Sequence, residues 1–150
     1  MLRISKLADY STVIMVCLAK VNGLMNVSEI TFETGVSKPT VSKLVKRLVQ
    51  AKLLLSVQGA KGGYRLAKQT ETISIADIIN AIEQRTGLTE CADKTSQCAL
   101  QLNCQISQHW RLIDKAIDGV LSHVKLSELS RPSSELSIEP IIRYVKRELV

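Results

Sequence analysis

The stretch SKPTVSKLVKRLVQ at residues 37–50 carries the pattern that decides the fold of this chain. Its apolar residues recur at the spacing of one buried helix face, and they are Val41, Leu44, Val45, Leu48 and Val49. Ser37 is a favourable N-cap, and Pro39 fits the first turn, where its missing N–H leaves no hydrogen bond unmade. We therefore predict a helix from Ser37 to about Lys52 whose outer face is polar and basic.

A shorter helix is predicted just before this one, over residues 28–34, with Ser28 as its N-cap and Gly35 at its end. Two helices joined by a short Gly-containing turn, the second basic on its outer face, are typical of a helix-turn-helix. Apolar residues at helical spacing predict a preceding helix over residues 6–22. Cys17 falls on the apolar stripe of that helix, so we interpret it as a core residue.

A hairpin is predicted directly after the basic helix. Residues 53–58 and 64–67 have strand character, and the glycine-rich segment 59–63 between them indicates a tight turn. A hairpin in this position is typical of the wing of a winged helix. A fourth helix, capped by Ser74 and running to about Gln84, completes a predicted winged-helix domain over residues 1–87, in an α+β, mainly α fold.

The charge of the chain is concentrated in this domain. The 150 residues include 20 Lys and Arg against 14 Asp and Glu, a net charge of +6. Residues 37–70 hold eight basic residues and no acidic one, which leaves a net −2 for the remainder. One basic face indicates an anionic partner, and double-stranded DNA fits better than a membrane surface because the face is polar.

The DNA-binding residues are predicted from the geometry of a recognition helix, whose N-terminal part meets base edges. The residues expected there are Lys38, Pro39, Thr40, Ser42 and Lys43. Lys46, Arg47 and the wing residue Lys61 are expected to contact phosphates, and Ser28 completes the candidate set.

Several function classes are disfavoured by the sequence. It shows no nucleophile–base pair, phosphate loop or catalytic histidine constellation, so we expect neither an enzyme nor a small-molecule substrate. No apolar run is long enough to span a bilayer and no secretory signal is visible, so we expect a cytoplasmic protein.

Three cysteines lie close together in a polar segment, residues 88–104. Their spacing, Cys91-x6-Cys98-x5-Cys104, is not the CxxC pattern of a zinc ribbon or a thioredoxin-type site. Three thiolates can hold an iron–sulfur cluster that takes a fourth ligand elsewhere, or zinc with His109 as the fourth ligand. A thiol redox switch, or no site at all, also fits the spacing.

A long helix is predicted over residues 105–124, within a dimerisation region at 105–130. Its apolar residues alternate by four and three, a spacing suited to packing along another helix. We predict that residues 106–124 form a homodimer seam, with packing into an internal core as the alternative. Residues 131–150 are expected to form a C-terminal tail with one further helix from Glu139, where Ile141, Ile142, Val145 and Leu149 could dock. A frayed tail is the alternative.

Several stretches together resemble the Rrf2 (IscR-like) family of bacterial winged-helix regulators, in particular those of the SUF iron–sulfur assembly system. The stretches, which cover about residues 1–130, are MLRISKLADYSTVIM (1–15), SKPTVSKLVKRL (37–48), GAKGGYRLA (59–67), ISIADIINAIE (73–83), CADKTSQCALQLNC (91–104) and HWRLIDKAIDGVLSHVKLSEL (109–129). The resemblance implies a homodimer that controls genes according to the state of an iron–sulfur cluster.

The resemblance also implies a set of cluster ligands. Cys91, Cys98 and Cys104 match the three family cysteines, and a two-iron–two-sulfur cluster is favoured over a four-iron–four-sulfur one. The histidine that IscR-like members place before the helix tryptophan is Ser107 here. Nitric-oxide-sensing members use an N-terminal Asp from the partner chain, which makes Asp9 the candidate fourth ligand and His109 the runner-up.

The expected function is therefore cluster-dependent regulation, with repression of iron–sulfur assembly genes and a palindromic operator. Two alternatives stay open at this point. One is a winged-helix repressor with a direct cysteine thiol switch, and the other is a zinc-stapled interaction module with incidental basic charge.

Overall fold

The computed structural model describes residues 4–21, 23–59, 61–83, 87, 89, 98, 104–132, 134 and 139–148. The described part is mainly helical with a two-stranded antiparallel sheet, which confirms the predicted fold class. The elements are α1 (Lys6–Val21), α2 (Val27–Thr34), α3 (Lys38–Gln50), β1 (Leu54–Val57), β2 (Gly63–Leu66), the short 3-10 helix η1 (Thr70–Thr72), α4 (Ile75–Glu83), α5 (Ser107–His123), α6 (Leu126–Leu129) and α7 (Glu139–Glu148).

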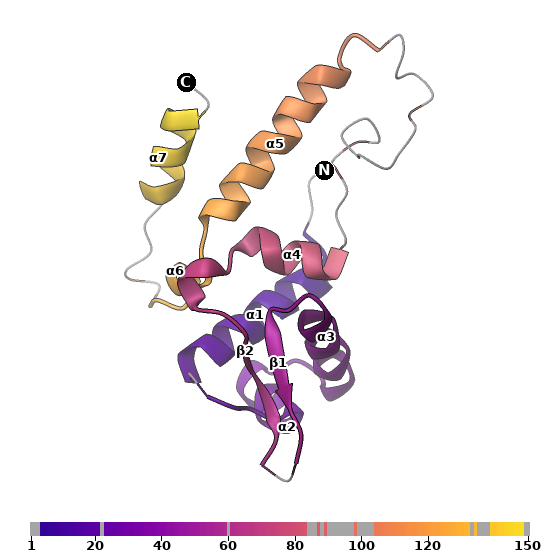
Figure 1. Cartoon of the computed structure of the whole chain (residues 1–150), viewed down its shortest axis with the longest axis vertical. Coiled ribbons are helices and arrows are strands. Elements are labelled where there is room, and N and C mark those ends of the chain that lie inside the picture. Colours follow the sequence, from indigo (N-terminus) through magenta and orange to yellow (C-terminus); the bar gives the residue numbers. More distant parts are fainter. Residues whose placement is uncertain are drawn as a thin grey trace.

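The first part of the chain forms a body in which α1 lies between the helix-turn-helix and α4 (Figure 1). Its core is aliphatic, as the scarcity of aromatic residues requires, and Ile14, Leu44 and Ile78 from three different helices are fully buried. Four of the five residues of the predicted stripe on α3 are buried, and Val49 is half-buried. The stripe thus orients α3 with its polar face outward.

The start of α2 differs from the prediction. Ser28 is not the N-cap, because the helix begins at Val27 and Asn26 caps it. The Asn26 side chain accepts hydrogen bonds from the amides of Ser28 and Glu29, at 2.9 and 3.0 Å, and the Glu29 carboxylate accepts one from the Asn26 amide at 2.7 Å. This reciprocal capping box satisfies more backbone donors than a serine cap two residues later could. Gly35 ends the helix with φ at 69°, as predicted.

The wing is fastened to the chain that enters α2. Strands β1 and β2 pair with Leu54 opposite Leu66, close to the predicted bounds. Met25 and Tyr64 exchange two backbone hydrogen bonds, at 3.0 and 2.8 Å. A Cβ on Gly63 would lie 2.6 Å from the Met25 carbonyl oxygen, so only glycine permits this approach. The wing and the helix-turn-helix are therefore held together by backbone contacts.

Helix α5 leaves this body, and α7 lies beside it (Figure 1). No side chain of α5 is buried. The expected last helix forms; of the side chains expected to dock, Ile141 is half-buried, Ile142 and Val145 are exposed, and Leu149 lies outside the described residues. The Tyr144 ring stacks on His123, with 4.0 Å between ring centroids, and its hydroxyl fills the space beside Gly119. The tail therefore contacts α5 through Tyr144, whose hydroxyl lies in the notch left by Gly119.

Candidate nucleic-acid interface and cysteine site

The outer face of α3 presents the predicted DNA-reading residues to solvent. Lys38, Pro39 and Lys43 are exposed, while Thr40 and Ser42 are half-buried. Ser37 occupies the N-cap position but makes no capping hydrogen bond to the backbone, because its hydroxyl is paired with that of Thr40 at 2.8 Å. The first turn of α3 therefore keeps amide donors free for an anionic partner.

The predicted phosphate-binding residues fall into two groups. Lys46 on α3 and Lys61 in the wing turn are exposed. Arg47 is half-buried, and its Nη1 donates a hydrogen bond to the Ile82 carbonyl at the end of α4, at 3.0 Å. This contact favours a structural role for Arg47 over the predicted phosphate contact.

Helix α2 has the opposite charge to α3. Ser28 is exposed one position after the start of α2, with the acidic residues Glu29 and Glu33 on the same helix and no basic residue among them. From α2 to β2, the cations thus lie on α3, in the turn after it and in the wing, the part expected to approach phosphates.

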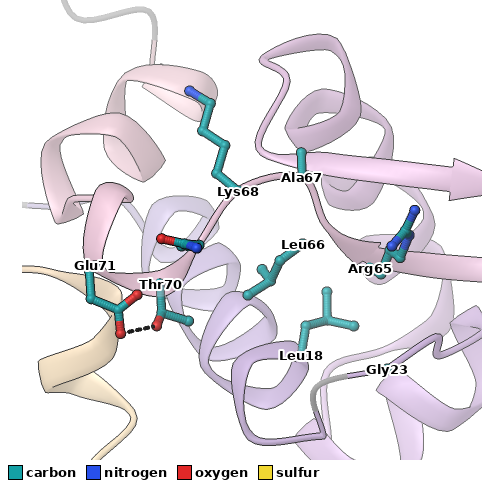
Figure 2. Close-up of a pocket in the computed structure, with 9 residues that line it drawn as sticks. Leu18, Gly23, Arg65, Leu66, Ala67, Lys68, Thr70 and Glu71 are labelled. Atoms are coloured by element: carbon teal, nitrogen blue, oxygen red, sulfur yellow. Dashed lines mark hydrogen bonds between the residues drawn. The ribbon is translucent and has the colours of Figure 1, made fainter.

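A hollow of about 670 Å³ lies between the end of α1, β2 and η1 (Figure 2). Leu18 and Leu66 supply its apolar lining, and Arg65, Lys68 and Glu71 supply charges of both signs. None of the predicted site residues lines it.

The cysteine site is only partly within the described residues. Cys98 and Cys104 are half-buried free thiols, and Cys91 lies outside the described part. The Cys104 carbonyl accepts a hydrogen bond from the Ser107 hydroxyl at 3.2 Å, so Cys104 is tied to the start of α5. Among the residues that the structure describes, no three metal-ligating side chains meet in one group.

The two candidates for the fourth ligand lie on different elements. Asp9 is exposed in the first turn of α1, and His109 is exposed in the first turn of α5, close to Cys104 along the chain. The start of α5 points away from the body that contains α1 (Figure 1). Within one protomer, Asp9 and His109 are therefore not brought together.

Cys17 behaves as the core residue that its position predicted. It packs against the buried cluster, and its thiol lies 3.8 Å from the Met25 sulfur. Burial, with a smaller contribution from Glu33, raises the pKa of the Cys17 thiol above its ordinary value.

The end of α4 is a junction that the sequence did not indicate. Besides the Arg47 contact to Ile82, the Glu83 carboxylate accepts a hydrogen bond from the Ser5 amide at 2.9 Å. These partners lie 35 and 78 residues apart in the chain, so no local pattern could have announced them.

A family model described as "Rrf2: Iron-dependent Transcriptional regulator" matches residues 4–147. The chain belongs to the Rrf2 family. Among its relatives are the HTH-type transcriptional regulator IscR of Photobacterium profundum, 28% identical over 89% of this chain and 78% of that protein, and Protein rrf2 of Nitratidesulfovibrio vulgaris, 29% identical over 73% of each.

Solved structures agree with this membership. CymR of B. subtilis, the global cysteine regulator, matches with a TM-score of 0.70 and 28% identity, over 87% of this chain and 97% of that one. IscR of T. potens matches with a TM-score of 0.68 and 25% identity, over 91% and 93%. This Rrf2-family member is therefore a DNA-binding transcriptional regulator and not an enzyme. Within its described helices, none is long and apolar enough to cross a membrane.

Proposed function

We propose that this protein represses iron–sulfur cluster assembly genes and is controlled by an iron–sulfur cluster held on Cys91, Cys98 and Cys104. The observation that carries the DNA-binding part is the outer face of α3, where Lys38, Pro39 and Lys43 are exposed over a fully apolar inner face. Similarity to IscR regulators supports the cluster part. As a regulator of chromosomal genes, the protein acts in the cytoplasm.

The DNA contacts follow from the position of α3 and the wing. Lys38, Pro39, Thr40, Ser42 and Lys43 read base edges, while Lys46 and Lys61 hold phosphates. Ser28, exposed near the start of α2, contacts the DNA backbone, because the first helix of a helix-turn-helix crosses it. The protein acts as a homodimer through residues 106–124, so the operator is an imperfect palindrome with half-sites about 34 Å apart or a multiple of it.

The cysteine chemistry fits the proposed cluster. Cys98 and Cys104 are half-buried free thiols, and thiols that bind iron must be free of disulfide bonds. A two-iron–two-sulfur cluster, when bound, would supply the redox and lability signal. Asp9 of the partner subunit would provide the fourth ligand, since α1 and the start of α5 lie apart within one protomer, and His109 is the alternative.

A second candidate is direct thiol sensing, in which cysteine oxidation replaces the cluster. The likeness to CymR, whose Staphylococcus aureus structure was also solved in an oxidised form, favours this alternative. The two free thiols Cys98 and Cys104 could serve it equally well.

Anaerobic purification distinguishes cluster-dependent control from direct thiol sensing. We expect a coloured protein containing iron and sulfide, bleached by alanine at Cys91, Cys98 or Cys104 but not at Cys17. A colourless protein whose DNA affinity changes on thiol oxidation would favour the second candidate, and bound zinc would indicate a structural metal. Asp9→Ala and His109→Ala compare the fourth ligands, because only the true ligand should shorten the lifetime of the cluster.

Operator binding across a salt series tests the DNA contacts. Lys46→Ala removes two phosphate contacts from a dimer, so the slope of log affinity against log salt should flatten by roughly 1.8. Lys43→Ala should relax base preference instead, by about 1–3 kcal/mol at one base pair. The reverse assignment would show that the helix is oriented differently in the groove.

A further inference from the structure

The geometry points to the last turn of α4 as the joint through which the cysteine segment controls the recognition helix, with Arg47 as its positioning residue. This inference rests on the proposed function, because it assumes that the state of residues 88–104 alters DNA binding. It assigns to Arg47 a role different from that of the neighbouring lysines.

The first arm of the joint runs from α4 to α3. Arg47 Nη1 donates to the Ile82 carbonyl at 3.0 Å, across 35 residues of chain. That carbonyl lies in the last described turn of α4, toward the negative end of the helix dipole. A guanidinium is well suited to this place, because it carries a permanent charge and donates in a fixed geometry.

The second arm runs from α4 to α1. The Ser5 amide donates to Glu83 Oε1 at 2.9 Å, and the Ser5 carbonyl accepts from the Asp9 amide at 3.0 Å. The residue proposed as the fourth cluster ligand thus lies one helical turn from a group bonded to α4. Two neighbouring residues, Ile82 and Glu83, are therefore bonded to both the recognition helix and the N-terminal helix.

The position of these two residues in the chain makes the joint sensitive to the cysteine segment. The described part of α4 runs to Glu83, and residues 88–104 follow it within a few positions in the sequence. A change in that segment which unwinds or rotates the last turn of α4 must move the Ile82 carbonyl away from Arg47. Because Arg47 lies on α3 and joins it to α4, losing this bond frees the recognition helix to change its tilt against DNA.

The test compares Arg47→Ala with Lys46→Ala in the full-length protein. For each, operator affinity is measured with the cluster loaded and after its removal by chelation, and visible absorbance reports the loading. Ligand coupling in proteins is usually about 5–150-fold. We expect wild-type protein and Lys46→Ala to keep their ratio of loaded to apo affinity, and Arg47→Ala to lose it to within about twofold at normal loading.

Two further measurements separate positioning from phosphate contact and from loss of folding. Lys46→Ala should flatten the salt slope and Arg47→Ala should not, and the amides of residues 81–83 should exchange faster in apo Arg47→Ala than in apo wild type. Arg47→Lys, which retains a charged donor, should restore part of the ratio and serves if Arg47→Ala does not fold.

Two results would overturn this inference and leave the proposed function standing. One is a wild-type ratio of loaded to apo operator affinity in Arg47→Ala, and the other is a salt slope in Arg47→Ala that is flattened as in Lys46→Ala. A wild-type protein without a cluster, or one whose affinity ignores the cluster, overturns the proposed function and this inference with it.

Discussion

The winged-helix body and helix α5 use their apolar residues in opposite ways. In the body, Leu44 and its neighbours on α1, α3 and α4 are shielded completely from solvent by other parts of the same chain. On α5 no side chain is buried, and Leu112 and Ile113 are 66% and 44% exposed. The body therefore holds its own core, whereas α5 presents the apolar surface that a homodimer seam requires.

The sharpest test of this contrast uses two leucines. Leu44→Ala should lower the free energy of unfolding by about 2–5 kcal/mol, because it leaves a cavity in a closed core. Leu112→Ala should change it by less than about 0.5 kcal/mol. Urea unfolding followed by circular dichroism measures both, and equal losses would mean that Leu112 is buried in the assembled protein.

The next effect concerns assembly. Ile113 lies on the predicted seam and is 44% exposed in the single chain. Ile113→Asp should raise the dimer dissociation constant by at least about tenfold, because a carboxylate would be buried against an apolar face. Lys115→Glu, a change at an exposed charged residue of the same helix that lies outside its apolar stripe, is the control. Sedimentation equilibrium measures both, and an unchanged dimer in Ile113→Asp would place the seam elsewhere.

The contact between α5 and α7 should give a smaller effect. A methyl group on Gly119 would overlap the Tyr144 hydroxyl, the far end of a flexible side chain, so Gly119→Ala should turn Tyr144 away and loosen α7. The net change in stability should be small, because alanine gains up to about 1 kcal/mol of helix propensity over glycine. Limited proteolysis after residue 130 reports the loosening. Adding Tyr144→Ala removes the clash, so the double variant should lose no further stability. If α7 of Gly119→Ala stays as protected as in wild type, the notch does not hold this helix.

Alanine substitutions at Asn26 and at Ser28 should differ by about 1 kcal/mol in their effect on the free energy of unfolding. Asn26→Ala should destabilise the protein by roughly that amount, since it removes a side chain that accepts two amide hydrogen bonds. Ser28→Ala should have almost no effect on thermal stability. A larger loss of stability from Ser28→Ala than from Asn26→Ala would indicate that Ser28 caps the helix.

The smallest effect is the pH dependence at Cys17. Its pKa is higher in the folded than in the unfolded protein, so folding favours the protonated thiol. The associated stability is present below the ordinary pKa of about 9 and is lost as the pH rises through the folded pKa. Cys17→Ala should therefore show less loss of stability between pH 8 and 10 than wild type. Identical losses of stability in the two proteins would show that groups other than Cys17 cause the pH dependence.

Local patterns predicted most of the body because its elements are determined by neighbours in sequence. The stripe on α3 gave both the helix and its buried face, and the glycines of the wing marked the turn. The error at α2 was also local, because Asn26 and Glu29 have the capping-box spacing and outweigh Ser28. A closer reading of that spacing would have located the cap.

The junction at the end of α4 and the α5–α7 contact could not be predicted in this way. Arg47 and Ile82, or Gly119 and Tyr144, meet only after distant segments have packed. A basic residue on a recognition helix looks the same in sequence whether it binds phosphate or a neighbouring carbonyl. For the cysteine site, the spacing narrowed the chemistry, while Cys91 lies outside the described residues and the ligand set stays a prediction.

The opposite charges of α2 and α3 also bear on how quickly this regulator finds its site. The carboxylates of Glu29 and Glu33 lie on one helix of the pair, and the lysines lie on the other and on the wing. Such a separation of charge gives the domain an electric dipole, and the field of DNA turns the protein during its approach. Encounters in which α3 leads are thereby favoured over those in which α2 leads. The association rate, and not only the affinity, should fall as ionic strength rises.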